Sequence, residues 1–242
     1  MGAGKDFVAS NGDVARSELD TIFSLQGDSF GYPDLPILDD FHFSMEPNSL
    51  VVLLGPSGCG KTTLLQRLSR NHRVAMMFQE PRLIPWFTVE QNLRFVLHNL
   101  DAQEQNAEIS RILEAVGLAS KRRAYPDQLS GGQRQRVNMA RAFVYPGEGL
   151  LLDEPFQGLD VVLRYELIGL LTSLWKQSPK PIVAVSHDPR EAALLGTDIR
   201  VFSGPPMTEV GRLPGNPAGP GVQNHHTLEL EEHILGLLMG SS

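Results

Sequence analysis

One short motif constrains the fold of this chain more than any other feature. The glycine-rich segment GPSGCGKT at 55–62 follows a wholly apolar stretch at 50–54 and opens a helical pattern. Such a short apolar stretch is typical of a strand that a parallel sheet buries on both faces. Glycines let successive backbone N–H groups curl around an anion, and the helix start adds partial positive charge. The motif therefore predicts a phosphate-binding loop between a strand and a helix.

This loop suits a nucleoside triphosphate and its magnesium ion. Lys61 can reach the β- and γ-phosphates, and the Thr62 hydroxyl suits Mg²⁺. Cys59 is interpreted as a small residue lining the loop, because no base that could activate its thiol is indicated nearby. The residues expected to bind the nucleotide here are Gly55, Pro56, Ser57, Gly58, Cys59, Gly60, Lys61, Thr62 and Thr63.

The rest of the chain alternates between strand and helix patterns. Apolar stretches like 50–54 recur at 74–78, 149–152 and 182–185, and two earlier strands are expected at 21–26 and around 41–45. Helical patterns lie at about 61–70, 88–100, 106–116, 131–144, 161–176 and 189–196. This alternation predicts an α/β fold with a largely parallel sheet.

Two of these strands end in polar residues, at the sheet edge where ligands bind. In LLLDE, Asp153 is suited to the magnesium shell. Glu154 is suited to accept a proton from the water that attacks the γ-phosphate, or to orient that water. His187, after the strand at 182–185, is expected either to contact the γ-phosphate or to hold Glu154 and the water.

Composition excludes several other classes of protein. The net charge of −7 argues against a nucleic-acid binder, and no apolar run is long enough to span a membrane. The first residues lack the apolar core of a signal peptide, and the single cysteine cannot form an internal disulfide. We therefore expect a protein made and kept in the cytoplasm.

The segment LSGGQ at 129–133, between the phosphate loop and LLLDE, makes residues 20–213 resemble the ATP-binding cassette of an ABC transporter. The resemblance implies a P-loop NTPase (RecA-like) fold. Such a fold has a mostly parallel core sheet, a small antiparallel β subdomain and a helical signature subdomain. The resemblance also implies an ATPase that converts ATP and water to ADP and phosphate with Mg²⁺. Residues 1–19 are then a flexible lead-in, and 214–242 are a Gly/Pro linker and a C-terminal helix capped by Thr227.

The resemblance also implies roles for particular residues. Gln79 touches Mg²⁺ and senses the transmembrane partner, so it joins Glu154 and His187 as a catalytic residue. Phe30 stacks on adenine, with Tyr32 as the alternative, and Asp160 lies at a dimer seam. The γ-phosphate held by a second subunit is capped by Ser130, Gly131, Gly132 and Gln133. This capping is physically reasonable, because Ser130 is a good helix N-cap and the glycines leave N–H groups open to an anion.

Several segments are similar to cassettes that import nitrate, sulfonate, taurine and related small anions: 78–86, 152–156, 203–206 and the end of the chain. This similarity implies an ATPase subunit on the cytoplasmic face of the membrane. It would bind transmembrane permease subunits, pair with a second cassette (we expect a homodimer) and work indirectly with an extracytoplasmic solute-binding protein. Trp86 and Phe87 either present a groove to a permease helix or pack the helical subdomain. The alternatives are a soluble non-transport ABC-type ATPase and a regulatory cassette with little turnover.

The chain departs from the family pattern in one segment. Only 17 residues separate Lys61 from Gln79, which is short of the usual spacing. The missing part normally forms a hairpin of the antiparallel subdomain. We therefore expect nucleotide chemistry to survive and the antiparallel sheet to be incomplete.

Overall fold

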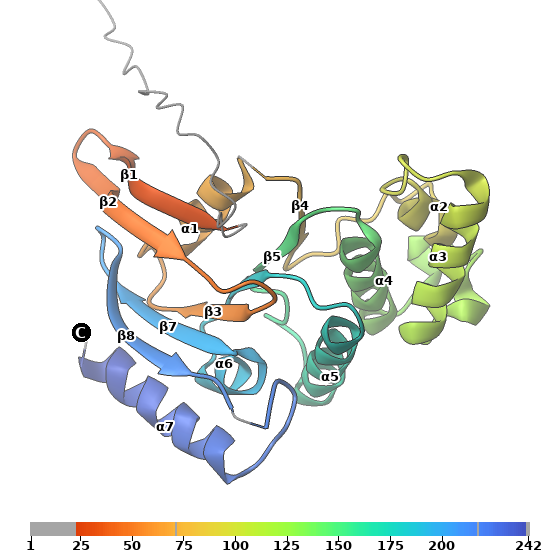
Figure 1. Cartoon of the computed structure of the whole chain (residues 1–242). Coiled ribbons are helices and arrows are strands. Elements are labelled where there is room, and N and C mark those ends of the chain that lie inside the picture. Colours follow the sequence, from red (N-terminus) through yellow and green to blue (C-terminus); the bar gives the residue numbers. More distant parts are fainter. Residues whose placement is uncertain (1–22, 71, 217, 241–242) are drawn as a thin grey trace, which may run out of the picture.

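The computed structural model describes residues 23–70, 72–216 and 218–240 (Figure 1). The expected lead-in at 1–19 lies outside this part of the chain. Eight strands are described: β1 (Ser24–Tyr32), β2 (Leu35–Ser44), β3 (Leu50–Leu54), β4 (Val74–Phe78), β5 (Gly149–Asp153), β6 (Ile182–Val185), β7 (Asp198–Ser203) and β8 (Thr208–Pro214). The helices are α1 (Lys61–Ser69), α2 (Val89–Arg94), α3 (Ala102–Ala115), α4 (Gly131–Val144), α5 (Val161–Gln177), α6 (Pro189–Leu195) and α7 (His225–Gly240).

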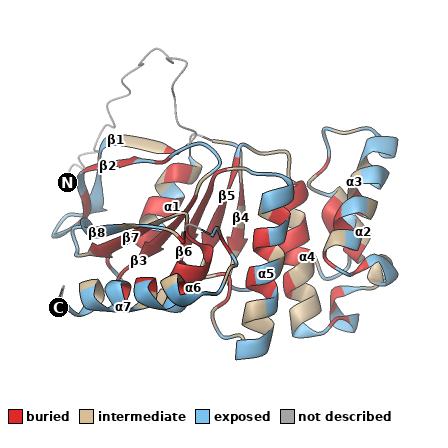
Figure 2. Ribbon diagram, turned by 60° about the horizontal axis from the view of Figure 1, so that its bottom comes forward, coloured by how far each residue is buried: buried red, intermediate tan, exposed pale blue. Residues whose placement is uncertain are grey.

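A six-stranded sheet forms the centre of the molecule, with the strand order β4-β5-β6-β3-β7-β8. All neighbouring strands are parallel except β8, which runs antiparallel to β7. Every residue of β3 and β6 is buried (Figure 2), which explains why their sequences are uniformly apolar. The predicted α/β fold with a mostly parallel sheet is confirmed.

Two hydrophobic clusters lie on opposite faces of this sheet, because successive residues of a strand point to opposite sides. Leu50, Val52 and Leu54 pack with residues of α4, α5, α6 and α7. Val51 and Leu53 pack instead with residues of α1 and of the β1–β2 region. The sheet is therefore covered on both faces, and its strand ends are left to form a site.

The antiparallel β subdomain is reduced to the two-stranded sheet β1–β2. Residues 70–73 alone link α1 to β4, so this connection has no room for a further hairpin. The incomplete antiparallel sheet expected from the short segment is thus present. At the other end of the molecule, α2 and α3 pack with α4 as a helical subdomain (Figure 1).

Some expected element bounds were wrong. The first strand runs over Ser24–Tyr32 rather than 21–26, of which 21 and 22 are outside the described residues. The helix expected at 88–100 ends at Arg94, and the next helix begins at Ala102 rather than near 106. Strands β7 and β8 were not predicted.

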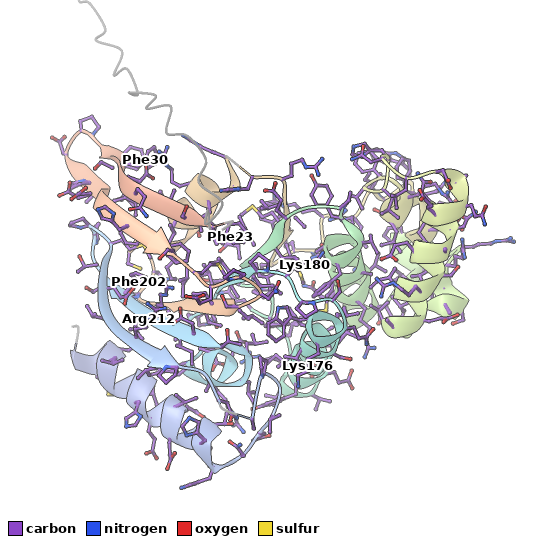
Figure 3. All side chains as sticks on the ribbon, viewed as in Figure 1. Phe23, Phe30, Lys176, Lys180, Phe202 and Arg212 are labelled. Atoms are coloured by element: carbon purple, nitrogen blue, oxygen red, sulfur yellow. The ribbon has the colours of Figure 1, made fainter. Side chains whose placement is uncertain are left out.

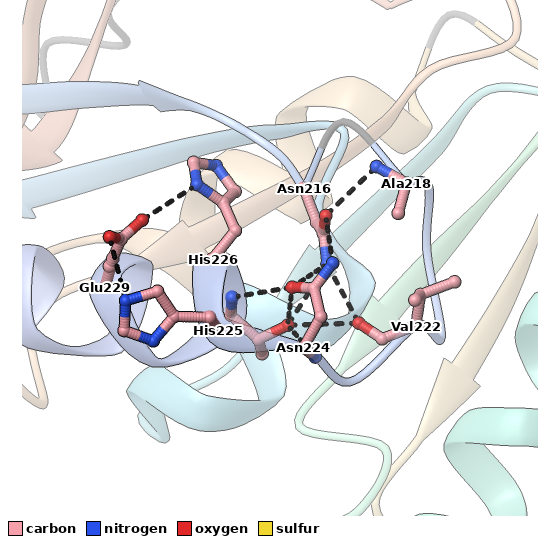
Figure 4. Close-up of polar contacts among 8 residues, drawn as sticks. Asn216, Ala218, Val222, Asn224, His225, His226 and Glu229 are labelled. Carbon is pink, nitrogen blue, oxygen red and sulfur yellow. Dashed lines mark hydrogen bonds and ion pairs between the residues drawn. The ribbon is translucent and has the colours of Figure 1, made fainter.

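The cap of the last helix also differs from the expectation. The helix begins at His225, so Asn224 rather than Thr227 is its N-cap: the Asn224 Oδ1 accepts the Thr227 N–H at 3.1 Å (Figure 4). The Thr227 hydroxyl accepts the Asn224 N–H in return, at 3.2 Å. Leu230 and Ile234 are buried against the body of the protein, so α7 packs on its own chain.

Candidate functional site

The predicted site residues follow strands that end at one edge of the sheet. In the sheet, Asp153 of β5 lies opposite Phe78 of β4 on one side and Val185 of β6 on the other. Val185 in turn lies opposite Leu53 of β3. The chain leaves each strand one or two residues later, so the phosphate loop, Gln79, Glu154 and His187 all emerge at this edge. The fold therefore gathers residues that are up to 132 positions apart along the chain.

The phosphate loop needs glycine at its two ends. Gly55 has φ +155°, and a Cβ there would lie 2.5 Å from the Phe202 carbonyl oxygen. Gly60, the N-cap of α1, has φ +117°, and a Cβ there would lie 3.0 Å from the Ile37 side chain. Any other residue at either position would be strained or would clash. Pro56, Ser57 and Gly58 are exposed at the tip of the loop, and Thr63 is half-buried on α1.

Lys61 folds back over the loop. Its Nζ donates to the Gly55 carbonyl at 2.7 Å and to the Pro56 carbonyl at 2.9 Å, and it lies 3.8 Å from the Cys59 sulfur. The Lys61 side chain and the Cys59 thiol are both buried. The Lys61 ammonium is thus held against the loop by two main-chain carbonyls.

Thr62 and Asp153 come together at the predicted magnesium site. The Thr62 hydroxyl lies 3.3 Å from each carboxylate oxygen of Asp153. Burial raises the pKa of Asp153, and the neighbouring Glu154 adds to this rise, whereas the Thr62 hydrogen bond and the Lys61 charge oppose it. A cation bound beside Asp153 would therefore stabilise its ionised carboxylate.

The donor set fits Mg²⁺ in particular. This ion binds through one or two protein oxygens and completes its shell with water and substrate phosphates. Within the described residues, no group of three or more His, Cys, Asp or Glu side chains could hold a metal ion by itself. Gln79, the third expected ligand, is exposed, and within the same part of the chain its side chain makes no hydrogen bond to Thr62 or Asp153.

Glu154 and His187 form a second pair at the same edge. The His187 Nδ1 lies 3.5 Å from the Glu154 Oε2. Glu154 adopts the left-handed φ of +49°, and its N–H donates to the Val185 carbonyl at 3.2 Å. Such a backbone conformation is costly for a non-glycine residue and is found at functional sites. The pairing agrees with the expectation that His187 holds Glu154.

The LSGGQ segment is built as a helix start. Ser130 is the N-cap of α4: its Oγ accepts the Gln133 N–H at 3.2 Å, and the Gln133 Oε1 accepts the Ser130 N–H at 3.0 Å. A Cβ on Gly132 would lie 2.7 Å from Leu163, and Gly131 is exposed. The predicted N-cap is confirmed. The first N–H groups of the helix have no partner within it and can meet an anion.

The structure places Asp160, expected at a dimer seam, at the start of α5, and Phe30, expected to stack on adenine, on β1. Asp160 is the N-cap of α5, and its carboxylate accepts the Leu163 N–H at 3.0 Å. Phe30 lies on β1 and is 36% exposed (Figure 3), and the Arg67 guanidinium lies over its ring, 5.6 Å from the centroid. Tyr32, the alternative, is 68% exposed at the end of the same strand.

A network behind His187 was missed by sequence reasoning. Arg164 Nη1 donates to Asp188 at 2.7 Å, and Arg164 Nε lies 3.4 Å from Glu191. The Ser186 hydroxyl donates to Glu191 at 2.6 Å, and burial raises the pKa of Glu191. Asp188 also caps α6, and the DP step at 188–189 was a signal for that cap.

A groove lies on the helical subdomain beside the Gln79 loop. Trp86 is 73% exposed and Phe95 is 61% exposed, so neither side chain packs the interior. The rings of Phe87 and Phe95 lie 6.2 Å apart. The groove is lined by Phe87, Gln91, Arg94, Phe95, Val96, His98, Gln105 and Tyr145. None of the helices that the structure describes is both long and apolar enough to cross a bilayer.

The fold and the glycine loop together define an α/β protein of the P-loop class. Comparisons with known proteins narrow this class. The model of the ABC transporter family matches residues 38–75 and 66–157. The taurine import ATP-binding protein TauB of Escherichia coli (strain K12) is 37% identical over 206 residues, covering 76% of this chain and 81% of the relative. The chain therefore belongs to the ABC transporter family, among its ATP-binding subunits.

A second relative and one solved structure are also similar to this chain. The aliphatic sulfonates import ATP-binding protein SsuB 1 of Rhodococcus jostii (strain RHA1) is 36% identical over 207 residues, covering 78% of this chain and 82% of the relative. The two relatives are named as import ATP-binding proteins, one for taurine and one for aliphatic sulfonates. The solved structure of cbiO1 from Clostridium perfringens, titled part of the ABC transporter complex cbiONQ, matches the fold with a TM-score of 0.70. It covers 82% of this chain and 89% of its own at 24% identity.

Proposed function

We propose that this chain is the ATP-hydrolysing subunit of an ABC importer for a small anion such as taurine, a sulfonate or nitrate. The observation that carries the proposal is the convergence of Thr62 with Asp153, and of Glu154 with His187, beside the phosphate loop. The names of the two relatives support the importer and its class of solute.

The residues divide the work of hydrolysis among them. Lys61 would exchange its loop carbonyls for the β- and γ-phosphate oxygens, and Thr62 and Asp153 would hold Mg²⁺. When bound, this ion neutralises phosphate charge. Glu154 accepts a proton from the water that attacks the γ-phosphorus, while the bond to the bridging oxygen breaks to give ADP and phosphate. His187 keeps the Glu154 carboxylate in place.

A second copy of the chain completes the site. The Ser130 oxygen already accepts the Gln133 N–H, so its hydroxyl hydrogen is free to donate outward, along with the first N–H groups of α4. In the proposed dimer these donors would cap the γ-phosphate held by the partner. Asp160 lies at the seam between the copies.

The groove beside Trp86 is the expected contact with the transmembrane permease. A short amphipathic helix of the permease would place its apolar side on Phe87 and Phe95 and its polar side near Arg94. In this arrangement the subunit is peripheral, on the cytoplasmic face of the membrane, and the solute-binding protein acts only through the permease. Crosslinking from position 86 should capture the permease; capture of the cassette alone would count against this surface.

The variant Glu154→Gln tests the catalytic proposal. It keeps the side-chain size and removes the base, so we expect nucleotide binding to persist while turnover falls by about 10²–10⁴-fold. The trapped nucleotide should also hold two copies together, which light scattering would detect as a doubled mass with ATP and Mg²⁺. The double variant that adds Lys61→Ala is the control and should stay monomeric. Unchanged phosphate release by the single variant would refute the role of Glu154.

A further inference from the structure

Helix α4 presents a row of polar side chains to the loop that carries Gln79. Gln135, Asn138 and Arg141 are spaced three residues apart, so they share one face of the helix. The first two are 4% and 2% exposed. Buried amides require hydrogen-bond partners, and here they find them in the main chain of a loop rather than in another helix.

The first of these contacts involves Gln79 itself. The Gln135 Nε2 donates to the Gln79 carbonyl at 2.7 Å. The Asn138 Nδ2 lies 3.5 Å from the Phe78 carbonyl and 3.4 Å from the Gln135 Oε1. Both polar groups of the Gln135 amide therefore have a partner: its NH₂ donates to the loop, and its oxygen accepts from Asn138 on the same helix.

The row continues to the next part of the loop. The Arg141 Nη1 donates to the Arg82 carbonyl at 2.7 Å, and its Nη2 donates to the Asn138 oxygen at 3.3 Å. The Arg82 guanidinium in turn lies 3.7 Å from the centroid of the Phe78 ring. Residues 78–82 are thus fastened to one rigid helix at both ends.

The side chain of Gln79 is not fastened in this way. It is exposed, and its Nε2 lies 3.9 Å from the position a Cβ on Gly158 would take. Within the described residues, the only hydrogen bond of Gln79 is the one that its main-chain oxygen accepts from Gln135. The reach of this side chain toward the Thr62–Asp153 pair is therefore set by where Gln135 holds its backbone.

We infer that Gln135 is a positioning residue: its amide fixes the backbone of Gln79 so that the Gln79 side chain can reach the magnesium ion. This inference rests on the proposed function. Because Ser130 caps the same helix, the anchor also ties the loop to the segment that would cap the partner's phosphate. Gln135 stands about 7–8 Å along α4 from that cap, at 1.5 Å per residue.

The substitution Gln135→Glu tests the inference with little change of shape. The carboxylate keeps an oxygen for Asn138 but cannot donate to the Gln79 carbonyl. A fluorescent ATP analogue is titrated into the full-length chain at a series of Mg²⁺ concentrations and again in EDTA. We expect the Mg²⁺ concentration for half-maximal binding to rise about three- to ten-fold, the worth of one hydrogen bond, with binding in EDTA unchanged. Gln135→Leu, which introduces no charge, should give the same shift.

The control is Val137→Ala, because Val137 is fully buried on the same helix and touches no part of the loop through a hydrogen bond. It should lower the melting temperature and leave the Mg²⁺ dependence as in the wild type. An unchanged Mg²⁺ dependence in both Gln135 variants, or an equal shift in the control, would overturn the positioning role alone. A wild-type chain that binds no nucleotide at any Mg²⁺ concentration would instead overturn the proposed function and this inference with it.

Discussion

The variant Asp153→Asn should be more stable than the wild type without nucleotide and less stable than the wild type with nucleotide bound. Burial raises the pKa of the Asp153 carboxyl, so the folded state is penalised as the pH rises through that raised value. Asparagine keeps an oxygen for the Thr62 hydroxyl and removes the charge. Relief of a functional-site cost of this kind is worth about 0.5–1 kcal/mol, at the lower end of what a single stabilising substitution gives. The gain should be present at neutral pH and shrink as the pH falls toward the ordinary value of 3.8.

With nucleotide and Mg²⁺ bound, the wild type should become the more stable of the two proteins. A ligand at a hundred times its Kd stabilises the fold by about 2.7 kcal/mol. In a domain of this size, each kcal/mol shifts the melting temperature by about 2–4 °C, so the wild type should gain about 5–11 °C. Loss of a magnesium ligand that costs about tenfold in affinity removes about 1.4 kcal/mol of that gain, or about 3–6 °C.

Thermal unfolding of both proteins, with and without ATP and Mg²⁺, measures this crossing. Asp198→Asn is the matched control, because Asp198 begins β7 at the opposite edge of the sheet and pairs with Arg200 and Arg212 at 2.8 and 2.9 Å. That variant should melt lower in both conditions and keep the wild-type response to nucleotide. If Asp153→Asn melted below the wild type without ligand, or gained as much from it, the reasoning on this carboxylate would be wrong.

Other residues give simpler tests. Ser130→Ala should lower the free energy of unfolding by about 1 kcal/mol, because the helix cap is lost. Turnover should fall, while calorimetry should find the ATP affinity of the monomer little changed. A loss of affinity equal to the loss of turnover would argue against capping across subunits. Glu90→Gln should cost about 1 kcal/mol at neutral pH, because hydrogen bonds from Arg122 and Arg94 lower the pKa of Glu90 to about 2. That contribution is present above pH 4.5 and is lost as the pH falls toward 2, so urea unfolding at several pH values should show the two proteins converging. A difference that did not change with pH would contradict this.

The apolar strands could be predicted from sequence because their burial, complete in β3 and β6 and partial in β4, determines their composition. Strands β3, β4 and β6 have the predicted bounds, and β5 is longer by only Asp153. The structure also has α4 as predicted, since Ser130 is both a cap residue and the start of the LSGGQ helix. The Thr62–Asp153 pair was foreseeable for the same reason, because strand ends of a parallel sheet share one edge.

The missed strands carry no such signal. In β7, Arg200 is 3% exposed because it pairs with Asp198 and donates to the Ser44 carbonyl, so a buried strand contains a charged residue. Strand β8 is mostly exposed and has no apolar run. The capping box of Asp101 and Glu104 did signal where α3 begins, and it was overlooked. The partner of Gln135 is a carbonyl 56 positions away, which no local pattern reveals.

Steady-state phosphate release by the purified chain tests the central claim most directly. With ATP present, we expect release that requires Mg²⁺ and disappears in Lys61→Ala, which removes the ammonium from the phosphate loop. Equal release by the two proteins would assign the activity to a contaminant, and no release by the wild type despite nucleotide binding would make the chain a regulatory cassette rather than an energising ATPase.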